Sequence, residues 1–313
     1  MLSLASYGGL KLYMWNKAKH EVDQVFNEIN HAMSAAYDLN VVAAYKQIST
    51  SVFGPIGIKG VSLRIPEFNE EVTVAELKLL EHDLDIDSKK GNLPLRIHLL
   101  IDGLRINVSL LEKMGKQFNK LKLQHDIKDD PTALVNRLGY QEIVRRSNDL
   151  LALGYSQLDM DLEYNMTINL NSKEASLFFR QNTKSLGNFK IKLNIVEMSD
   201  NINSAVLGAR IKEARFEYVD KSYMDRFIKS YADDVNMTLP AFREKLVRDI
   251  KEDFADKNIK LGDRSVKNIQ TFVKKPEKIV FTIYPYRPIG IESLKHYKVG
   301  DIPSLLNLQA HLE

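Results

Sequence analysis

The clearest pattern in this chain is a strict alternation of polar and apolar residues over residues 157–171. Every even position carries an apolar or aromatic side chain, and Asp159, Asp161 and Glu163 are among the polar residues at odd positions. Successive side chains of a β-strand point to opposite faces, whereas a helix would distribute the same residues around its circumference. We therefore predict a long strand of an antiparallel sheet, with one face covered and the other solvated or lining a polar space.

Further segments show the same alternation of polar and apolar residues, which predicts additional strands. In the longest of them, the apolar phase changes near Gly103, which predicts either a β-bulge or a hairpin turn at that point. Short polar joints between the segments have the composition of hairpin loops. The predicted strands occupy residues 61–65, 71–77, 93–108, 175–181, 188–196, 209–218 and 279–283.

Other parts of the chain repeat apolar residues at spacings of three and four, which predicts amphipathic helices. Ser222 and Asp225 approximate a capping box, and Pro240 lies where the following helix begins. The predicted helices lie within residues 16–37, 109–153, 222–231, 240–254 and 264–274.

Strands and helices therefore fall into separate blocks, which favours an α+β fold of antiparallel β-meanders packed against amphipathic helices. The two halves share a loose plan of a helix followed by a meander. We accordingly divide the chain into a stub at residues 1–15, a first unit at 16–125 and a second unit at 126–313. Duplication of one unit is a hypothesis only, because no residue-level repeat connects the halves.

Composition narrows the classes of protein that the chain can represent. Of its 313 residues, 44% are hydrophobic and 27% are charged, which is enough for a sizeable core. The net charge of +3 is small and dispersed, so we expect no nucleic-acid partner. The absence of cysteine excludes thiol catalysis, disulfides and thiolate metal sites.

No motif for catalysis, cofactor binding or metal binding stands out. The seven histidines form no helical metal-binding pair, and there is no Gly-x-Ser-x-Gly elbow. Asp159, Asp161 and Glu163 share one strand face and offer an acid and base in principle. Such a row of acidic side chains more often serves only to keep one face of a sheet solvated, and we favour that interpretation. We predict a protein that is not an enzyme and that holds no cofactor or metal.

The first fifteen residues are apolar and aromatic but too short to span a bilayer. Tyr7, Tyr13 and Trp15 are of the type found where a membrane helix leaves the hydrocarbon. One interpretation is the outer stub of a membrane anchor whose upstream part is missing. The other is the first turns of a core-packing helix.

Two segments carry a resemblance to a known family. The start of the chain resembles that of inner-membrane-anchored bacterial proteins of the YdgA-like and AsmA-like kind, through the apolar stub, the helix at 16–37 and the glycine-containing run 44–61. Near the other end, residues 272–285 resemble a closing segment of YdgA-like proteins. The resemblance implies a periplasmic body, a single-pass anchor in the inner membrane and no catalytic residues to carry over. The alternative is that the protein is soluble and lies in the cytoplasm.

Two non-enzymatic functions follow from these patterns. The favoured one is a scaffold or interaction module of the cell envelope, with the membrane and envelope proteins as partners. The alternative is a carrier or sensor of a hydrophobic ligand such as a lipid, held between the sheet and the helices. For that groove the sequence offers Tyr164, Phe227, Tyr231, Phe242 and Phe254, although the same rings would also serve as plain core.

Overall fold

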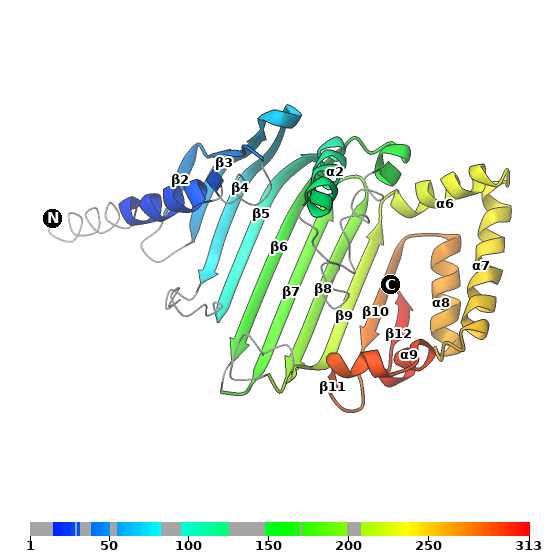
Figure 1. The fold of residues 1–313 in the computed structure, drawn as a ribbon. Helices are drawn as coiled ribbons and strands as arrows, with labels where there is room; N and C mark the ends of the chain where they lie inside the picture. Colours follow the sequence, from blue (N-terminus) through cyan, green and yellow to red (C-terminus); the bar gives the residue numbers. More distant parts are fainter. Residues whose placement is uncertain are drawn as a thin grey trace. The chain divides into compact units, whose positions relative to one another are not determined.

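The protein has an α+β fold in which twelve described strands join in antiparallel neighbour pairs, as the separated blocks of strands and helices predict (Figure 1). The computed structural model describes residues 15–28, 30–31, 39–50, 55–82, 95–124, 148–169, 171–198 and 208–313, with residues 117–124 described as backbone only. The predicted stub, apart from Trp15, and the predicted boundary at 125 and 126 lie outside the described residues. The chain forms two compact units, Met1–Leu80 with Leu100–Asp161 and Glu81–Leu99 with Leu162–Glu313.

The first unit is a meander with a helix. Its strands follow the order β1, β3, β4, β5 and β6, with β2 also pairing β3. A core of Leu39, Val41, Ile65 and Leu110 joins the helix α2 to these strands. The elements are β1 (Val42–Ala44), β2 (Gln47–Ser49), β3 (Ile56–Ile65), η1 (Pro66–Phe68), β4 (Glu70–His82), β5 (Arg96–Asn107), α2 (Val108–Gln124) and β6 (Gln157–Asn169), of which β4, β5 and β6 continue into the second unit.

The strand β5 runs without interruption through Gly103, so the hairpin alternative for the phase change is wrong. Gly103 adopts a φ of 62°, a left-handed conformation that suits glycine. Its N–H donates to the carboxylate of Asp161 at 2.8 Å, and an added Cβ would lie 2.8 Å from Cβ of Ala75. The predicted change of phase therefore coincides with a backbone irregularity at one glycine inside a continuous strand.

The second unit contains the longest antiparallel run, in the order β6, β7, β8, β9, β10 and β12, with β11 pairing β9 (Figure 1). The long alternation at 157–171 forms β6, as predicted. The remaining strands are β7 (Glu174–Thr183), β8 (Gly187–Val196), β9 (Arg210–Asp220), β10 (Lys278–Ile283), β11 (Ile289–Gly290) and β12 (Gln309–Leu312).

This run of strands has one apolar and one polar face. On the apolar face the rings of Phe179, Phe189, Phe216 and Phe281 meet edge to face, with centroid separations of 6.3, 4.5 and 6.0 Å. Such pairs add to the stabilisation that burial of the rings already provides. The alternate residues of the same strands point to the opposite face, where lysine, arginine and glutamate predominate.

Three helices pack together, and the last of them packs against β10 and β12. A core of Ile228, Ala232, Phe242 and Val273 holds them to one another. Thr238 caps the second helix by accepting the N–H of Ala241 at 3.4 Å. These helices are α6 (Tyr223–Asp234), α7 (Leu239–Asp256) and α8 (Asp263–Lys274), and the short helices that follow are η4 (Glu292–His296), η5 (Val299–Asp301) and α9 (Ile302–Leu305).

The capping box predicted at Ser222 and Asp225 is not formed. The Ser222 hydroxyl donates to the carbonyl of Ser185 at 2.6 Å, a tertiary partner that competes with the helix N-terminus. The backbone N–H of Met224 instead donates to the carboxylate of Asp220 at 2.9 Å.

Side chains bind backbone groups at one residue of each outer strand, Ala43 of β1 and Ala310 of β12. In the second unit, the N–H of Ala310 donates to the Ser265 hydroxyl at 3.0 Å, and its carbonyl accepts from the Asn268 amide at 2.7 Å. In the first unit, the N–H of Ala43 donates to the side-chain Oδ1 of Asn30 at 2.8 Å. Unpaired edge groups invite pairing with other chains, so these contacts protect the fold from association.

Candidate functional site

The polar face of the second unit contains a hollow of about 660 Å³ over β7, β8, β9 and β10. The antiparallel register places its floor residues in two rows that cross the strands, because residues opposite each other share a face. The first row is Ser176, Asn194 and Glu213, and the second is Phe178, Lys192, Arg215 and Thr282. We call this hollow the polar groove.

Two cations lie directly opposite each other in the second row. Lys192 pairs with Arg215 across β8 and β9, an arrangement of like charges that destabilises a sheet unless anions offset it. Arg215 is offset by Glu217 at 3.0 Å and by Glu313 at 2.8 Å. Lys192 is exposed and forms no ion pair with any residue that the structure describes. Glu213, which also lines the groove, accepts a 2.5 Å hydrogen bond from the Asn194 amide.

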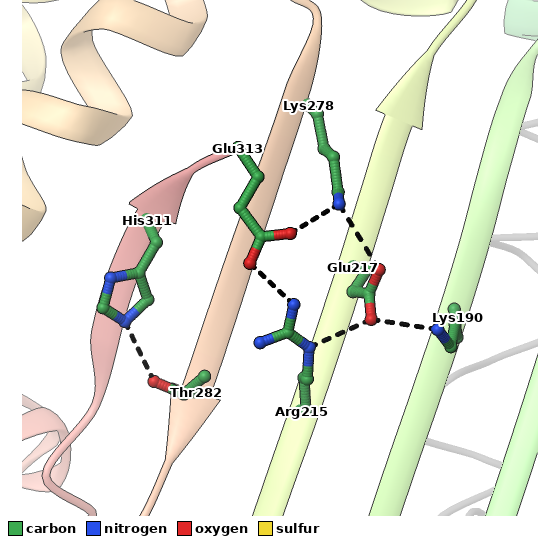
Figure 2. A network of polar contacts seen from close by, with 7 residues as sticks. All are labelled: Lys190, Arg215, Glu217, Lys278, Thr282, His311 and Glu313. Carbon is green, nitrogen blue, oxygen red and sulfur yellow. Dashed lines mark hydrogen bonds and ion pairs between the residues drawn. The ribbon is translucent and has the colours of Figure 1, made fainter.

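A charged network extends from Arg215 along the same face (Figure 2). Glu217 lies at its centre, with the ammonium groups of Lys190 at 3.1 Å and of Lys278 at 3.7 Å. Burial by itself would raise the pKa of Glu217, but the hydrogen bonds from Arg215 and Lys190 outweigh this effect and lower that pKa. Glu217 is therefore a fixed internal anion of the sheet.

Glu313 is the more accessible carboxylate of the network. Figure 2 shows its side chain directed at Lys278 and Arg215, with oxygen–nitrogen distances of 2.5 and 2.8 Å. The hydrogen bonds from Lys278 and then Arg215 lower the pKa of Glu313 to about 2. Lys278 and Arg215 thus form a two-cation cradle for a carboxylate, and Arg215 belongs both to this cradle and to the polar groove.

An exposed aromatic ring borders the groove. The backbone of Tyr284 is fixed, because its N–H donates to the Leu306 carbonyl at 3.1 Å and its carbonyl accepts from the Asn307 amide at 3.1 Å. Tyr284 as a residue is nevertheless 62% exposed, and Tyr286 nearby in the chain is 91% exposed. Rigid backbone with an accessible tyrosine is typical of recognition surfaces.

A second hollow of about 240 Å³ adjoins the polar groove. Ser176 and Asn194 line both hollows, and Thr167 and Asn169 extend the second one to β6. The open polar surface therefore continues across the strands from β10 to β6.

The acidic row on β6 has individual partners. Asp159 pairs with Arg105 at 3.2 Å, and Asp161 accepts the Gly103 N–H. Glu163 contacts Nε2 of His98 at 3.0 Å and a nitrogen of Arg180 at 2.6 Å. These contacts support the interpretation of the row as a structural feature of a wet sheet face.

Among the described residues, no group of three histidine or acidic side chains is placed to hold a metal ion. None of the helices in the described ranges has the length and apolarity needed to cross a bilayer.

The aromatic residues predicted to line a lipid groove are dispersed. Phe242 is buried in the helix core, where Phe227 packs against it. The ring of Tyr231 contacts that of Phe227 in a tilted arrangement, with centroids 4.8 Å apart, and Tyr231 remains half exposed. Phe254 lies on α7, and Tyr164 lies on β6, where its hydroxyl contacts the Met166 sulfur at 3.3 Å. Three strands separate β6 from β10 in the strand order, so Tyr164 is remote from the helices that pack beside β10.

Sequence reasoning missed the polar groove. Lys190 and Lys192 alternate on β8, as Arg215 and Glu217 do on β9, and this pattern indicates a charged strand face. The opposition of Lys192 and Arg215 depends on the register between strands, which no local pattern specifies.

Comparison with known proteins adds little to this description. A family model described only as an uncharacterized protein matches residues 159–313, which begins within β6 and covers every later element. No curated protein matches the chain.

Proposed function

We propose that this protein is a non-enzymatic interaction module that binds an extended polar partner along the polar groove. The observation that carries the proposal is the opposition of Lys192 and Arg215 on the groove floor, where Lys192 lacks a partner among the described residues. Glu217 and Glu313 offset the charge of Arg215, but no described carboxylate pairs with Lys192, and an anionic group of a ligand would offset that charge. The accessible ring of Tyr284 supplies an aromatic contact beside this pair.

The contacts that cap the outer strands favour the groove, rather than the sheet edges, as the binding surface. A partner that added a strand would need free backbone groups, and the N–H of Ala43 and both the N–H and the carbonyl of Ala310 are already bound. A partner that lies across the polar face needs only side-chain contacts, which the groove provides.

A panel of defined probes tests the proposal. Labelled hexapeptides of neutral, basic and acidic composition and a set of oligosaccharides would be titrated against the whole chain by fluorescence anisotropy. Ser176→Trp places a large ring between the two hollows, and Lys251→Trp places the same ring on exposed α7. We expect saturable binding of a polar probe that Ser176→Trp abolishes and Lys251→Trp preserves. Equal binding by both variants, or no binding of any polar probe, would refute the proposal.

A carrier of a hydrophobic ligand is the second candidate. The partly exposed ring pair of Phe227 and Tyr231 on α6 favours it, since adjacent exposed aromatic rings form an apolar patch that a hydrophobic ligand can cover. A fluorescent fatty acid tests this function. Saturable binding that Tyr231→Ser weakens would support the carrier, whereas absence of binding at micromolar protein would contradict it.

We propose the cell envelope as the location, on the basis of the aromatic stub at 1–15 and the resemblance of the chain to YdgA-like and AsmA-like proteins. Fractionation of cells that produce the protein from its natural gene tests this location. We expect recovery with the inner membrane and release by detergent but not by concentrated salt. Recovery in the soluble cytoplasm would contradict it.

A further inference from the structure

We infer that the ligand of the polar groove is an acidic peptide segment, whose carboxylates contact Lys192 and take the place that Glu313 holds between Arg215 and Lys278. This inference rests on the proposed binding function of the groove and specifies the chemistry of its ligand.

The charges of the surface favour an anion. The groove and the adjoining network contain four cations (Lys190, Lys192, Arg215 and Lys278) and three carboxylates (Glu213, Glu217 and Glu313). Glu217 is enclosed, with 15% of its side chain exposed, and Glu213 is held by Asn194. Glu313 is 41% exposed, so it is the carboxylate that an incoming ligand can displace.

The contacts of Glu313 show how the cradle binds a carboxylate. One oxygen accepts from Nζ of Lys278 and the other from Nη2 of Arg215, a charge-assisted pair of contacts from two neighbouring strands. The bound carboxylate belongs to a glutamate that directly follows the extended strand β12. The cradle therefore already accommodates a glutamate from an extended chain, which favours a peptide over an acidic sugar.

The dimensions of the groove fit a short segment. Its floor crosses four strands, β7 to β10, which are spaced about 4.8 Å apart and so span about 14 Å. An extended peptide advances about 3.3 Å per residue, so roughly four or five residues cross this distance. Such a segment can place one carboxylate at Lys192 and another at the cradle, with Tyr284 beside it.

Fluorescein-labelled hexaglutamate tests the inference, with hexaglutamine as the neutral control peptide. The titrations use the whole chain at low ionic strength, because salt screens contacts between exposed charges. Lys192→Gln removes an unpaired charge from the groove, and Lys251→Gln removes the same charge from exposed α7. Glu313→Gln removes the internal competitor without changing the size of the side chain.

We expect hexaglutamate but not hexaglutamine to bind. Lys192→Gln should raise the Kd about fivefold or more, Glu313→Gln should lower it about threefold, and Lys251→Gln should leave it unchanged. Circular dichroism of each variant establishes that it is folded.

Three results would overturn the inference: equal effects of Lys192→Gln and Lys251→Gln, weaker binding by Glu313→Gln, or stronger competition by trigalacturonate than by hexaglutamate. If hexaglutamate does not bind while a neutral probe binds and is lost in Ser176→Trp, this inference fails and the proposed function stands. If no polar probe binds, both fail.

Discussion

At the scale of single residues, the best-defined electrostatic centre of the first unit is Glu70 at the start of β4. Its carboxylate accepts hydrogen bonds from the Asn107 amide at 2.7 Å, from the Lys113 ammonium at 2.8 Å and from the Ser109 hydroxyl at 2.8 Å. Only 11% of the Glu70 side chain is exposed. These hydrogen bonds, with that from Asn107 foremost, lower the pKa of Glu70 from 4.5 to about 2.

Glu70→Gln should therefore destabilise the fold at neutral pH and matter little in acid. A carboxylate whose pKa is lower in the folded state stabilises the protein above its unfolded pKa, and this contribution is lost as the pH falls from about 4.5 toward 2. The shift corresponds to at most about 3 kcal/mol. Urea titrations of both proteins at pH 7 and pH 3 measure the difference. A difference that is the same at both pH values would contradict this role.

At the scale of elements, the strand β6 shows how far local pattern determines structure. The alternation predicts its two faces, and the structure buries Ile168 while the adjacent Thr167 lines the smaller hollow. Periodicity likewise predicts α6, α7 and α8, because each has one apolar stripe. The cap at Ser222 could not be predicted, since its competing partner Ser185 belongs to a distant hairpin.

Ile168→Asp should cost at least about 3 kcal/mol of unfolding free energy, because it buries an unpaired charge on the covered face. Thr167→Asp, one residue away on the polar face, is the matched control and should change stability by less than about 1 kcal/mol. Urea titrations of both variants measure these changes in the free energy of unfolding. Similar losses from both substitutions would mean that the strand does not separate a covered face from a wet one.

The outer strand β12 provides a prediction about association. Ser265→Ala and Asn268→Ala remove the two side chains that bind the backbone of Ala310. Each loss leaves a buried backbone group unpaired, so we expect about 1–2 kcal/mol of destabilisation from each. The double variant should also self-associate in analytical ultracentrifugation, because the loss of both contacts weakens the cover that α8 gives the edge of β12. Lys267→Ala, on the exposed side of α8, is the control, and a double variant that remains as monodisperse as this control would refute the edge-capping role.

At the scale of the whole chain, the sequence predicts the fold class much better than the candidate site. Helices and strands follow from periodicities that are local, whereas the polar groove depends on which residues the register brings together. Lys192 and Arg215 meet only because β8 and β9 pair as they do, and Tyr284 reaches the groove from the turn after β10. The lipid groove predicted from aromatic residues illustrates the same point, since the strand order separates Tyr164 from the helices.

The central claim is that the polar groove of the second unit is the binding surface of this protein. The most direct test is nuclear magnetic resonance of the isotope-labelled whole chain during titration with hexaglutamate, because it locates the contact without any substitution. We predict saturable shifts of the backbone amides of Lys192, Asn194, Arg215 and Thr282, with those of α7 unchanged. Shifts confined to other elements, or no shifts at millimolar peptide, would contradict the account.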